Sequence, residues 1–200
     1  FGQHVLSPLL ARFQALHPAL RYELLFTDRR VDLLREGLDL AFRISSRPPE
    51  DWVAQPVLRF AVRAYAAAGS ALLDGPQVLA DLPCLLLGQH EEPLAGRWLH
   101  EASGERLDVM LQASAWGSDI NSLLAMARAG AGVVLAPDFC VPAGSGLVDV
   151  LPGCRLLVAE GEWVQALTLP QPVGSETARA LVRFVRAELA SGPVSREQIG

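Results

Sequence analysis

A strict two-residue alternation over residues 38–44 constrains the fold of this sequence more than any other feature. Apolar side chains occupy every second position there, and Asp39, Ala41 and Arg43 stand between them. Because successive side chains of a β-strand point to opposite faces of its sheet, this pattern predicts a strand. Gly37 precedes it at a position typical of the left-handed residue that ends a helix. A helix followed directly by a strand is characteristic of α/β proteins.

The residues before this strand predict a further helix and strand in the same order. Ser7 and Pro8 are typical of a helix start, and Pro18 of the chain just beyond a helix end. A strand is expected over residues 21–26, and Asp28 is expected to cap a second helix. Helices and strands that alternate with short links predict a parallel sheet with right-handed crossovers.

The middle and end of the chain contain similar elements in a less regular order. Residues 88–106 are polar and are expected to form a loop with a little helix around Trp98. Helices are expected at 76–82, at 119–129 and from a cap at Ser175 onward. Strands are expected at 62–67, 84–87, 107–112, 133–136, 155–159 and 163–169.

Charge is distributed unevenly along the chain. Residues 1–63 hold nine arginines and seven acidic residues, residues 64–168 hold four and twelve, and residues 169–200 hold four and three. An acidic middle between mildly basic ends indicates two lobes, with the C-terminus returning to the first. The net charge of -5 argues against a nucleic-acid-binding surface on this chain by itself. No apolar run approaches the roughly 18 residues that cross a membrane.

Several motifs that suggest catalysis or cofactor binding have simpler structural explanations. Gly130 and Gly132 follow a predicted helix and precede a strand, whereas a phosphate-binding glycine loop runs from a strand into a helix. His90 and His100 lack metal-ligand spacing, and Ser145 lies in a glycine-flanked turn. We therefore expect no metal, no cofactor and no enzymatic activity. The chain has three cysteines, an odd number, and all are expected to be buried free thiols: Cys84, Cys140 and Cys154.

Polar residues recur where predicted strands end and predicted helices begin. Ligands of open parallel sheets bind at such positions, because helix N-termini offer spare N–H donors. If two lobes face each other, these residues would suit a small carboxylate or another anion. A structural alternative stays open, in which Asp28 and Asp119 cap helices and Arg43 pairs with Asp39 or Asp51. The segments are residues 2–4, Thr27-Asp28, Arg43-Ile44-Ser45 and Ser118-Asp119.

Taken in order, several stretches resemble the effector-binding (regulatory) domain of LysR-type transcriptional regulators. The most diagnostic is residues 36–44, EGLDLAFRI. The others are residues 1–13 with His17-Pro18, 28–33, 67–72, 79–85, Ser118-Asp119, 129–139 (AGAGVVLAPDF) and 183–185. Ser118 departs from the asparagine that many members have, and Trp116 is unusually bulky for its position.

The resemblance implies an α/β fold of the periplasmic-binding-protein-like type II, with two α/β lobes joined by two crossover strands. Lobe I would comprise residues 1–67 and 169–200, and lobe II residues 68–168. A winged helix-turn-helix DNA-binding domain, absent from this chain, would precede residue 1. An anionic or aromatic small-molecule effector would bind between the lobes and modulate the oligomer on DNA.

The resemblance also implies a set of effector-binding residues and partners. The cleft would be lined by Gly2, Gln3, His4, Thr27, Asp28, Arg43, Ile44, Ser45, Trp116, Ser118, Asp119, Pro137 and Phe139. Regulatory domains of the family pair as homodimers or homotetramers, and the helix over 9–16 with the strand over 21–26 is the candidate surface. Promoter DNA would bind through the preceding domain, in the cytoplasm and without membrane contact.

Two other classes of protein stay open from the sequence. A solute-binding protein of a transport system would share the fold and would carry a signal peptide. A hydrolase or transferase on an α/β sheet would need a nucleophile and a base assembled in the cleft.

Overall fold

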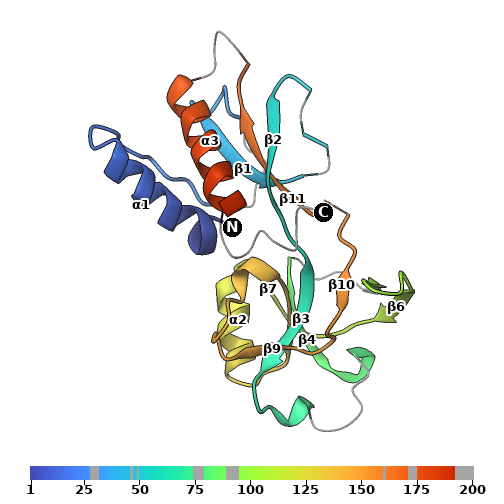
Figure 1. The fold of residues 1–200 in the computed structure, drawn as a ribbon. Helices are drawn as coiled ribbons and strands as arrows, with labels where there is room; N and C mark the ends of the chain where they lie inside the picture. The colour runs from blue at the N-terminus through green and yellow to red at the C-terminus, as the bar shows by residue number, and fades with distance from the viewer. Residues whose placement is uncertain are drawn as a thin grey trace. The chain divides into compact units, whose positions relative to one another are not determined.

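The computed structural model describes residues 1–27, 32–45, 47–48, 50–73, 79–88, 95–159, 161–170 and 175–191. The chain divides into two compact units, residues 1–60 with 159–200, and residues 61–158 (Figure 1). The chain passes from one unit to the other at residues 60–61 and 158–159. The boundaries expected from the sequence, after residues 67 and 168, differ from these positions.

The first unit contains a three-stranded antiparallel sheet and two long helices. A π-helical turn η1 (Gly2–Leu6) continues into α1 (Ser7–Leu16), and α3 spans Glu176–Ser191. The strands are β1 (Leu40–Ile44), β2 (Val53–Arg59) and β11 (Trp163–Thr168), in the order β1-β11-β2.

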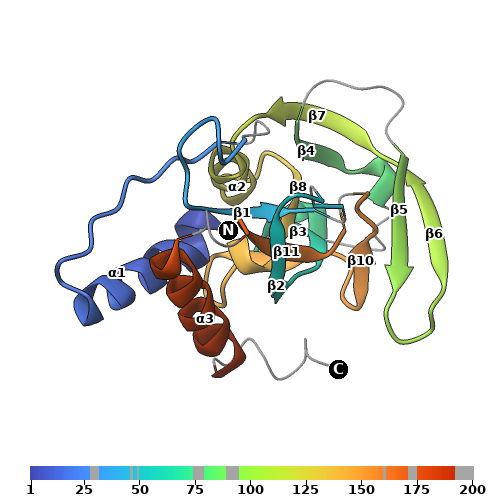
Figure 2. The same ribbon diagram turned by 90° about the horizontal axis from the view of Figure 1, so that it is seen from above.

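Helices α1 and α3 pack together and share one core with β1 (Figure 2). Leu10 and Phe13 from α1 and Val185 from α3 are buried in this core, with Phe42 of β1 packed against it. The rings of Phe13 and Phe184 are 5.2 Å apart between centroids, a separation at which aromatic pairs attract. The apolar faces of α1 and α3 therefore pack against each other in this core.

The second unit is built on an eight-stranded mixed sheet with the helix α2 (Ile120–Arg128). The strand order is β6-β5-β10-β3-β8-β4-β7, with β9 paired to β3. Residues of β4 alternate between two cores, Leu86 on one side of the sheet and Leu85 with α2 on the other. The strands are β3 (Val62–Ala67), β4 (Pro83–Leu87), β5 (Ala95–His100), β6 (Arg106–Met110), β7 (Gln112–Gly117), β8 (Val133–Pro137), β9 (Leu147–Asp149) and β10 (Cys154–Leu156). Three-residue 3-10 turns complete the unit: η2 (Ala71–Leu73), η3 (Leu79–Asp81) and η4 (Asp138–Cys140).

Several local predictions are confirmed. The alternating residues form β1, and Gly37 before them has a φ of +66°. Ser175 caps α3 by accepting a hydrogen bond from the Ala178 amide at 3.3 Å. All three cysteines are free thiols, of which Cys84 and Cys140 are buried and Cys154 is half-buried.

The prediction of a strand over residues 21–26 is wrong. This segment is extended, but it belongs to no strand of the described sheets. Leu24, Leu25 and Phe26 are each about half exposed, so the apolar residues that suggested a strand are not buried in this unit.

The expected parallel sheet is found only in part. Both strand pairs of the first unit are antiparallel, whereas β4 pairs in parallel with β7 and with β8 in the second. Ser7 is not a helix cap, because the chain is already helical from Gly2 and the Ser7 hydroxyl donates to the Gly2 carbonyl at 2.8 Å. Residues 33–37 form turns instead of a second helix, and the predicted cap Asp28 lies outside the described residues.

The expectation of a loop with a little helix around Trp98 is also wrong. Trp98 lies in β5 and is 1% exposed, packed in the core beside β10 and β6. The single strand expected at 107–112 is two strands, β6 and β7, which do not pair with each other.

Candidate functional site

In the first unit, the predicted residues near the N-terminus lie together in one turn next to the segment that ends at Thr27. Gly2, Gln3 and His4 all lie in η1. A side chain at Gly2 would overlap the ring of Phe26, so this turn abuts the segment that ends at Thr27. The ring of Phe1 packs on Phe42 with 5.5 Å between centroids.

Arg43 and Ile44 are the last two residues of β1, as the sheet-end argument predicted. Arg43 is half-buried and lies directly opposite Gln165 of β11. Ser45 follows the strand, and its hydroxyl accepts a hydrogen bond from the Arg47 amide at 3.2 Å. Thr27 is exposed, while Asp28 lies outside the described residues. A guanidinium and a hydroxyl therefore stand at the carboxyl end of β1.

In the second unit, Asp119 is the N-cap of α2. Its carboxylate accepts hydrogen bonds from the amides of Asn121 and Ser122, at 3.3 and 2.9 Å, and from the Ser122 hydroxyl at 2.7 Å. These bonds, those from Ser122 most, lower the pKa of Asp119. The capping alternative is thus confirmed for Asp119, and an external anion at this helix end would compete with its carboxylate.

Capping by Asp119 predicts an acid-sensitive helix end. A carboxylate whose pKa is lowered in the folded state stabilises it above the unfolded pKa, and this contribution is lost as pH falls through the folded pKa. We expect hydrogen exchange at the Ser122 amide to accelerate on acidification relative to the core amides. Asp119→Asn should keep the cap and remove this pH dependence. An equal pH response in both proteins would contradict the assignment.

The remaining predicted residues of the second unit do not gather around one point. Trp116 of β7 packs against the core that contains Leu86, while Phe139 packs against the core that contains Leu85 and α2. Because these cores lie on opposite sides of the sheet, the structure separates Trp116 from Phe139. Pro137 ends β8, and Ser118 is exposed just before the cap of α2.

Asp138, next to Pro137, was not singled out from the sequence. Its amide donates to the Ala61 carbonyl at 2.9 Å, and its carboxylate accepts from the Ala61 amide at 3.2 Å. Burial raises the pKa of Asp138. The side chain thus fastens the first residue of the second unit to the end of β8.

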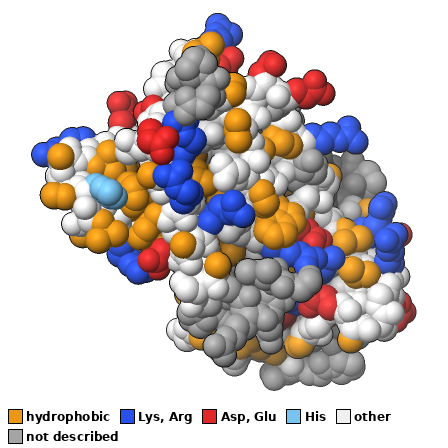
Figure 3. Space-filling view, turned by 45° about the horizontal axis from the view of Figure 1, so that its top comes forward, with side chains coloured by type: hydrophobic (Ala, Val, Ile, Leu, Met, Phe, Trp, Pro, Cys, Tyr) orange, Lys and Arg blue, Asp and Glu red, His pale blue; other side chains and the backbone are white. Residues whose placement is uncertain are grey.

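The sequence also missed an ion-pair group in the second unit. Arg63 of β3 contacts Glu101 at 2.8 Å, the Cys154 carbonyl at 3.0 Å and Asp149 at 3.8 Å. Arg155 of β10 approaches Glu101 at 3.8 Å. Figure 3 shows arginine side chains beside acidic ones on the face that it draws. The group therefore links β3, which carries Arg63, to β9 and β10.

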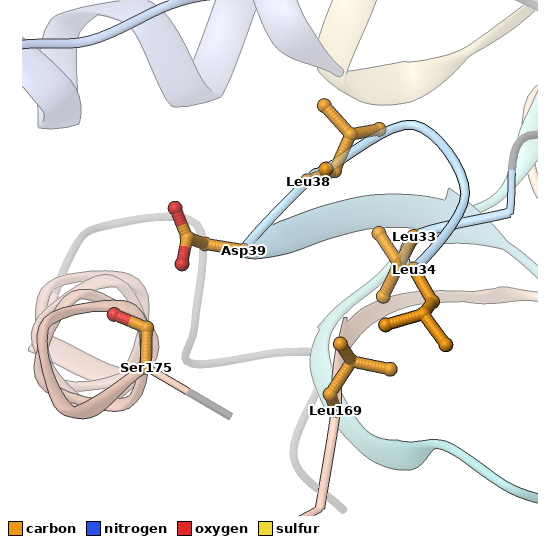
Figure 4. A pocket seen from close by; sticks show the side chains of 7 residues that line it. Leu33, Leu34, Leu38, Asp39, Leu169 and Ser175 are labelled. Carbon is orange, nitrogen blue, oxygen red and sulfur yellow. The ribbon is translucent and has the colours of Figure 1, made fainter. Parts of the chain in front are cut away.

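A small pocket of about 140 Å³ lies in the first unit, and none of its lining residues was predicted as a site residue. Leu34 and Leu169 lie on one side of it, and the Asp39 carboxylate lies toward Ser175 at the start of α3 (Figure 4). Leu33, Gly37 and Leu38 complete the lining.

The described residues contain neither a metal-binding cluster nor a membrane-spanning helix. Within them, no three His, Cys, Asp or Glu side chains are placed to hold a metal ion. His100 accepts a hydrogen bond from the Ser103 amide through Nδ1 at 3.2 Å, while His90 lies outside this part of the chain. None of the helices in the described ranges has the length and hydrophobicity to cross a membrane.

The two α/β units, between which the chain crosses twice, have a fold of the periplasmic-binding-protein-like type II class. A family model described as the LysR substrate binding domain matches residues 1–190, so the chain belongs to this family. The fold class expected from the resemblance is confirmed.

Solved structures of LysR-type regulators share this fold. The full-length virulence activator AphB of Vibrio cholerae aligns with a TM-score of 0.75 at 18% identity, over 94% of this chain and 64% of that one. The regulatory domain of CrgA from Neisseria meningitidis aligns with a TM-score of 0.73 at 21% identity, over 94% and 93%. The effector domain of AmpR from Pseudomonas aeruginosa aligns with a TM-score of 0.70 at 24% identity, over 94% of this chain and 92% of that one.

Curated relatives are transcriptional regulators. An uncharacterised HTH-type regulator of Haemophilus influenzae is 28% identical over 163 residues, which is 76% of this chain and 54% of that protein. The regulator DmlR of Escherichia coli is 29% identical over 102 residues, 49% of this chain and 33% of that protein. The chain thus spans about half the length of the first of these relatives, and it corresponds to the regulatory domain of a LysR-type regulator.

Proposed function

We propose that this chain senses a small anionic or aromatic effector for a cytoplasmic bacterial transcription regulator whose DNA-binding domain precedes residue 1. The observation that carries the proposal is the position of Arg43 at the carboxyl end of β1 in a LysR substrate binding domain. A guanidinium at a sheet end binds carboxylates through two parallel hydrogen bonds. The Ser45 hydroxyl beside it supplies a further polar contact.

The proposed mechanism is binding without catalysis. A ligand shifts an equilibrium between two arrangements of a protein only by the difference in its affinity for them. An effector held by the polar residues at the end of β1 would favour one arrangement and thereby change the oligomer on promoter DNA. The regulators among the relatives favour this role over that of a transport solute-binding protein.

Replacing Arg43 by alanine should weaken binding of an anionic effector by about 10- to 100-fold, because a charge-assisted hydrogen bond is worth about 1.5–3 kcal/mol. Titration calorimetry with a carboxylate that raises the melting temperature of the wild type measures this loss. Arg106→Ala is the matched control, since Arg106 is exposed on β6 and its removal changes the net charge equally. Equal affinities of wild type and Arg43→Ala would remove Arg43 from the site.

We also propose that α1 and residues 21–27 form the surface through which two copies of the chain pair. Leu16, Leu24, Leu25 and Phe26 are all more than half exposed there. Apolar side chains gathered on a surface favour association, because each Å² of apolar surface that becomes buried lowers the free energy by about 25 cal/mol.

Leu24→Glu is expected to shift the chain from dimer to monomer in sedimentation velocity. Burying an unpaired carboxylate in the interface would cost more than the association gains. Leu107→Glu is the control, since Leu107 is comparably exposed on β6 in the other unit. Dimers of unchanged stability in Leu24→Glu would exclude this surface.

A further inference from the structure

The amide side chain of Gln165 is unusual in the first unit. Its Oε1 atom is buried and accepts a hydrogen bond from no donor among the residues that the structure describes. Buried acceptors in native proteins are nearly always paired, because an unpaired one loses its hydrogen bonds to water without replacement. An unpaired buried acceptor lowers the stability of the fold, so its presence needs a functional explanation.

The strand register places Gln165 on the same face of the sheet as Arg43. Directly opposite residues of an antiparallel pair share a face, and Gln165 lies opposite Arg43 in the β1–β11 ladder. The neighbouring pair, Phe42 and Ala166, faces the helices, since Phe42 packs in the core with α1 and α3. Arg43 and Gln165 therefore look away from the helices, at the end of β1.

The opposite face provides a contrast that shows what a satisfied glutamine looks like in this sheet. Gln55 of β2 lies opposite Ala166, on the helix side. Its Oε1 accepts a hydrogen bond from the Arg186 guanidinium of α3 at 3.3 Å. The acceptor of Gln55 is thus satisfied within the fold, whereas that of Gln165 stands next to a residue of the proposed effector site.

We infer that Gln165 is a specificity-determining residue, whose Oε1 accepts a hydrogen bond from a hydroxyl or N–H group of an effector whose anionic group lies at Arg43. This inference rests on the proposed function and names its ligand class, a small carboxylate that also carries a hydrogen-bond donor. A carboxylate without the donor leaves Oε1 unpaired and binds more weakly.

The first test needs no ligand. Gln165→Met keeps the length of the side chain and removes the buried acceptor, so the melting temperature of the unliganded chain should rise by about 2–4 °C. Gln55→Met is the matched control on the other face, where loss of the bond to Arg186 gives no rise. A lower melting temperature in Gln165→Met would show that the fold itself satisfies the amide, and would overturn the inference.

The second test uses carboxylates that differ only in one hydroxyl, salicylate against benzoate and 3-hydroxybutyrate against butyrate, in titration calorimetry. The wild type and Gln55→Met should bind the hydroxylated member of a pair about tenfold more tightly, and Gln165→Met should lose this preference while still binding both. Gln165→Glu should bind neither, because its carboxylate would pair with Arg43.

The outcomes separate this inference from the proposed function. If Gln165→Met keeps the hydroxyl preference, the role of Gln165 is wrong, while a loss of binding in Arg43→Ala still supports the effector site. If the wild type binds no member of either pair, the proposed ligand class is wrong and the inference falls with it.

Discussion

Replacing Gly132 by alanine is expected to lower the free energy of unfolding by about 3–4 kcal/mol, measured by urea denaturation. Gly132 leads from α2 into β8 with a φ of +156°, and a Cβ atom there would overlap the carbonyl oxygen of Pro83. That oxygen belongs to β4, which pairs in parallel with β8 through Cys84 and Val133. Because a backbone carbonyl in a sheet cannot rotate aside, the overlap can be removed only if the two strands separate.

Gly130 supplies the control for this prediction. Its φ is +84°, but no atom lies within 4 Å of the position that its Cβ would take. Gly130→Ala therefore costs only the left-handed conformation, about 1 kcal/mol. Equal losses in the two variants would mean that backbone conformation alone, without the contact to Pro83, explains the glycines of this turn.

The patterns that predicted this part of the fold correctly are local. The alternation in residues 38–44, the apolar run after Gly132 and the capping residues Asp119 and Ser175 each depend on near neighbours in sequence. Periodicity and capping are properties of a single element, so a sequence expresses them directly.

The errors concern how elements pair over long separations. Nothing local indicates that β1 is antiparallel to β11, since the partners Phe42 and Ala166 are far apart in the chain. β5 was missed because one of its two buried positions is Gly96, which has no apolar side chain, and this weakens the alternation around Trp98. Residues 21–26 show the converse, an apolar pattern whose side chains remain exposed in this unit.

The candidate site was predictable to a similar extent. The rule that ligands bind at strand ends singled out Arg43 and Ser45, and both lie at the end of β1. Gln165 was not predicted as a site residue, because its proposed role depends on its register with Arg43 and on an unpaired buried atom. The only sequence signal at Arg63 is a charged residue within an otherwise apolar strand.

Replacing Arg63 by alanine is expected to lower the free energy of unfolding at pH 7 by about 2–3 kcal/mol. The Arg63 side chain is 21% exposed and contacts Glu101, Asp149 and the Cys154 carbonyl. Its removal leaves two carboxylates close together without their common cation. Arg97→Ala is the control, because Arg97 and Asp108 are 66% and 78% exposed and such pairs contribute below about 1 kcal/mol.

The pH dependence of the Arg63→Ala defect distinguishes lost charge pairing from lost packing. Burial raises the pKa of Asp149, and the charge of Arg63 opposes that rise. Without Arg63 the folded-state pKa rises further above the unfolded value, so the folded variant binds a proton more readily and its stability falls as pH increases. The deficit relative to wild type should therefore shrink between pH 7 and pH 4.5 in urea denaturation. A deficit that stays constant over this range would assign the role of Arg63 to the packing of its aliphatic stem against the sheet.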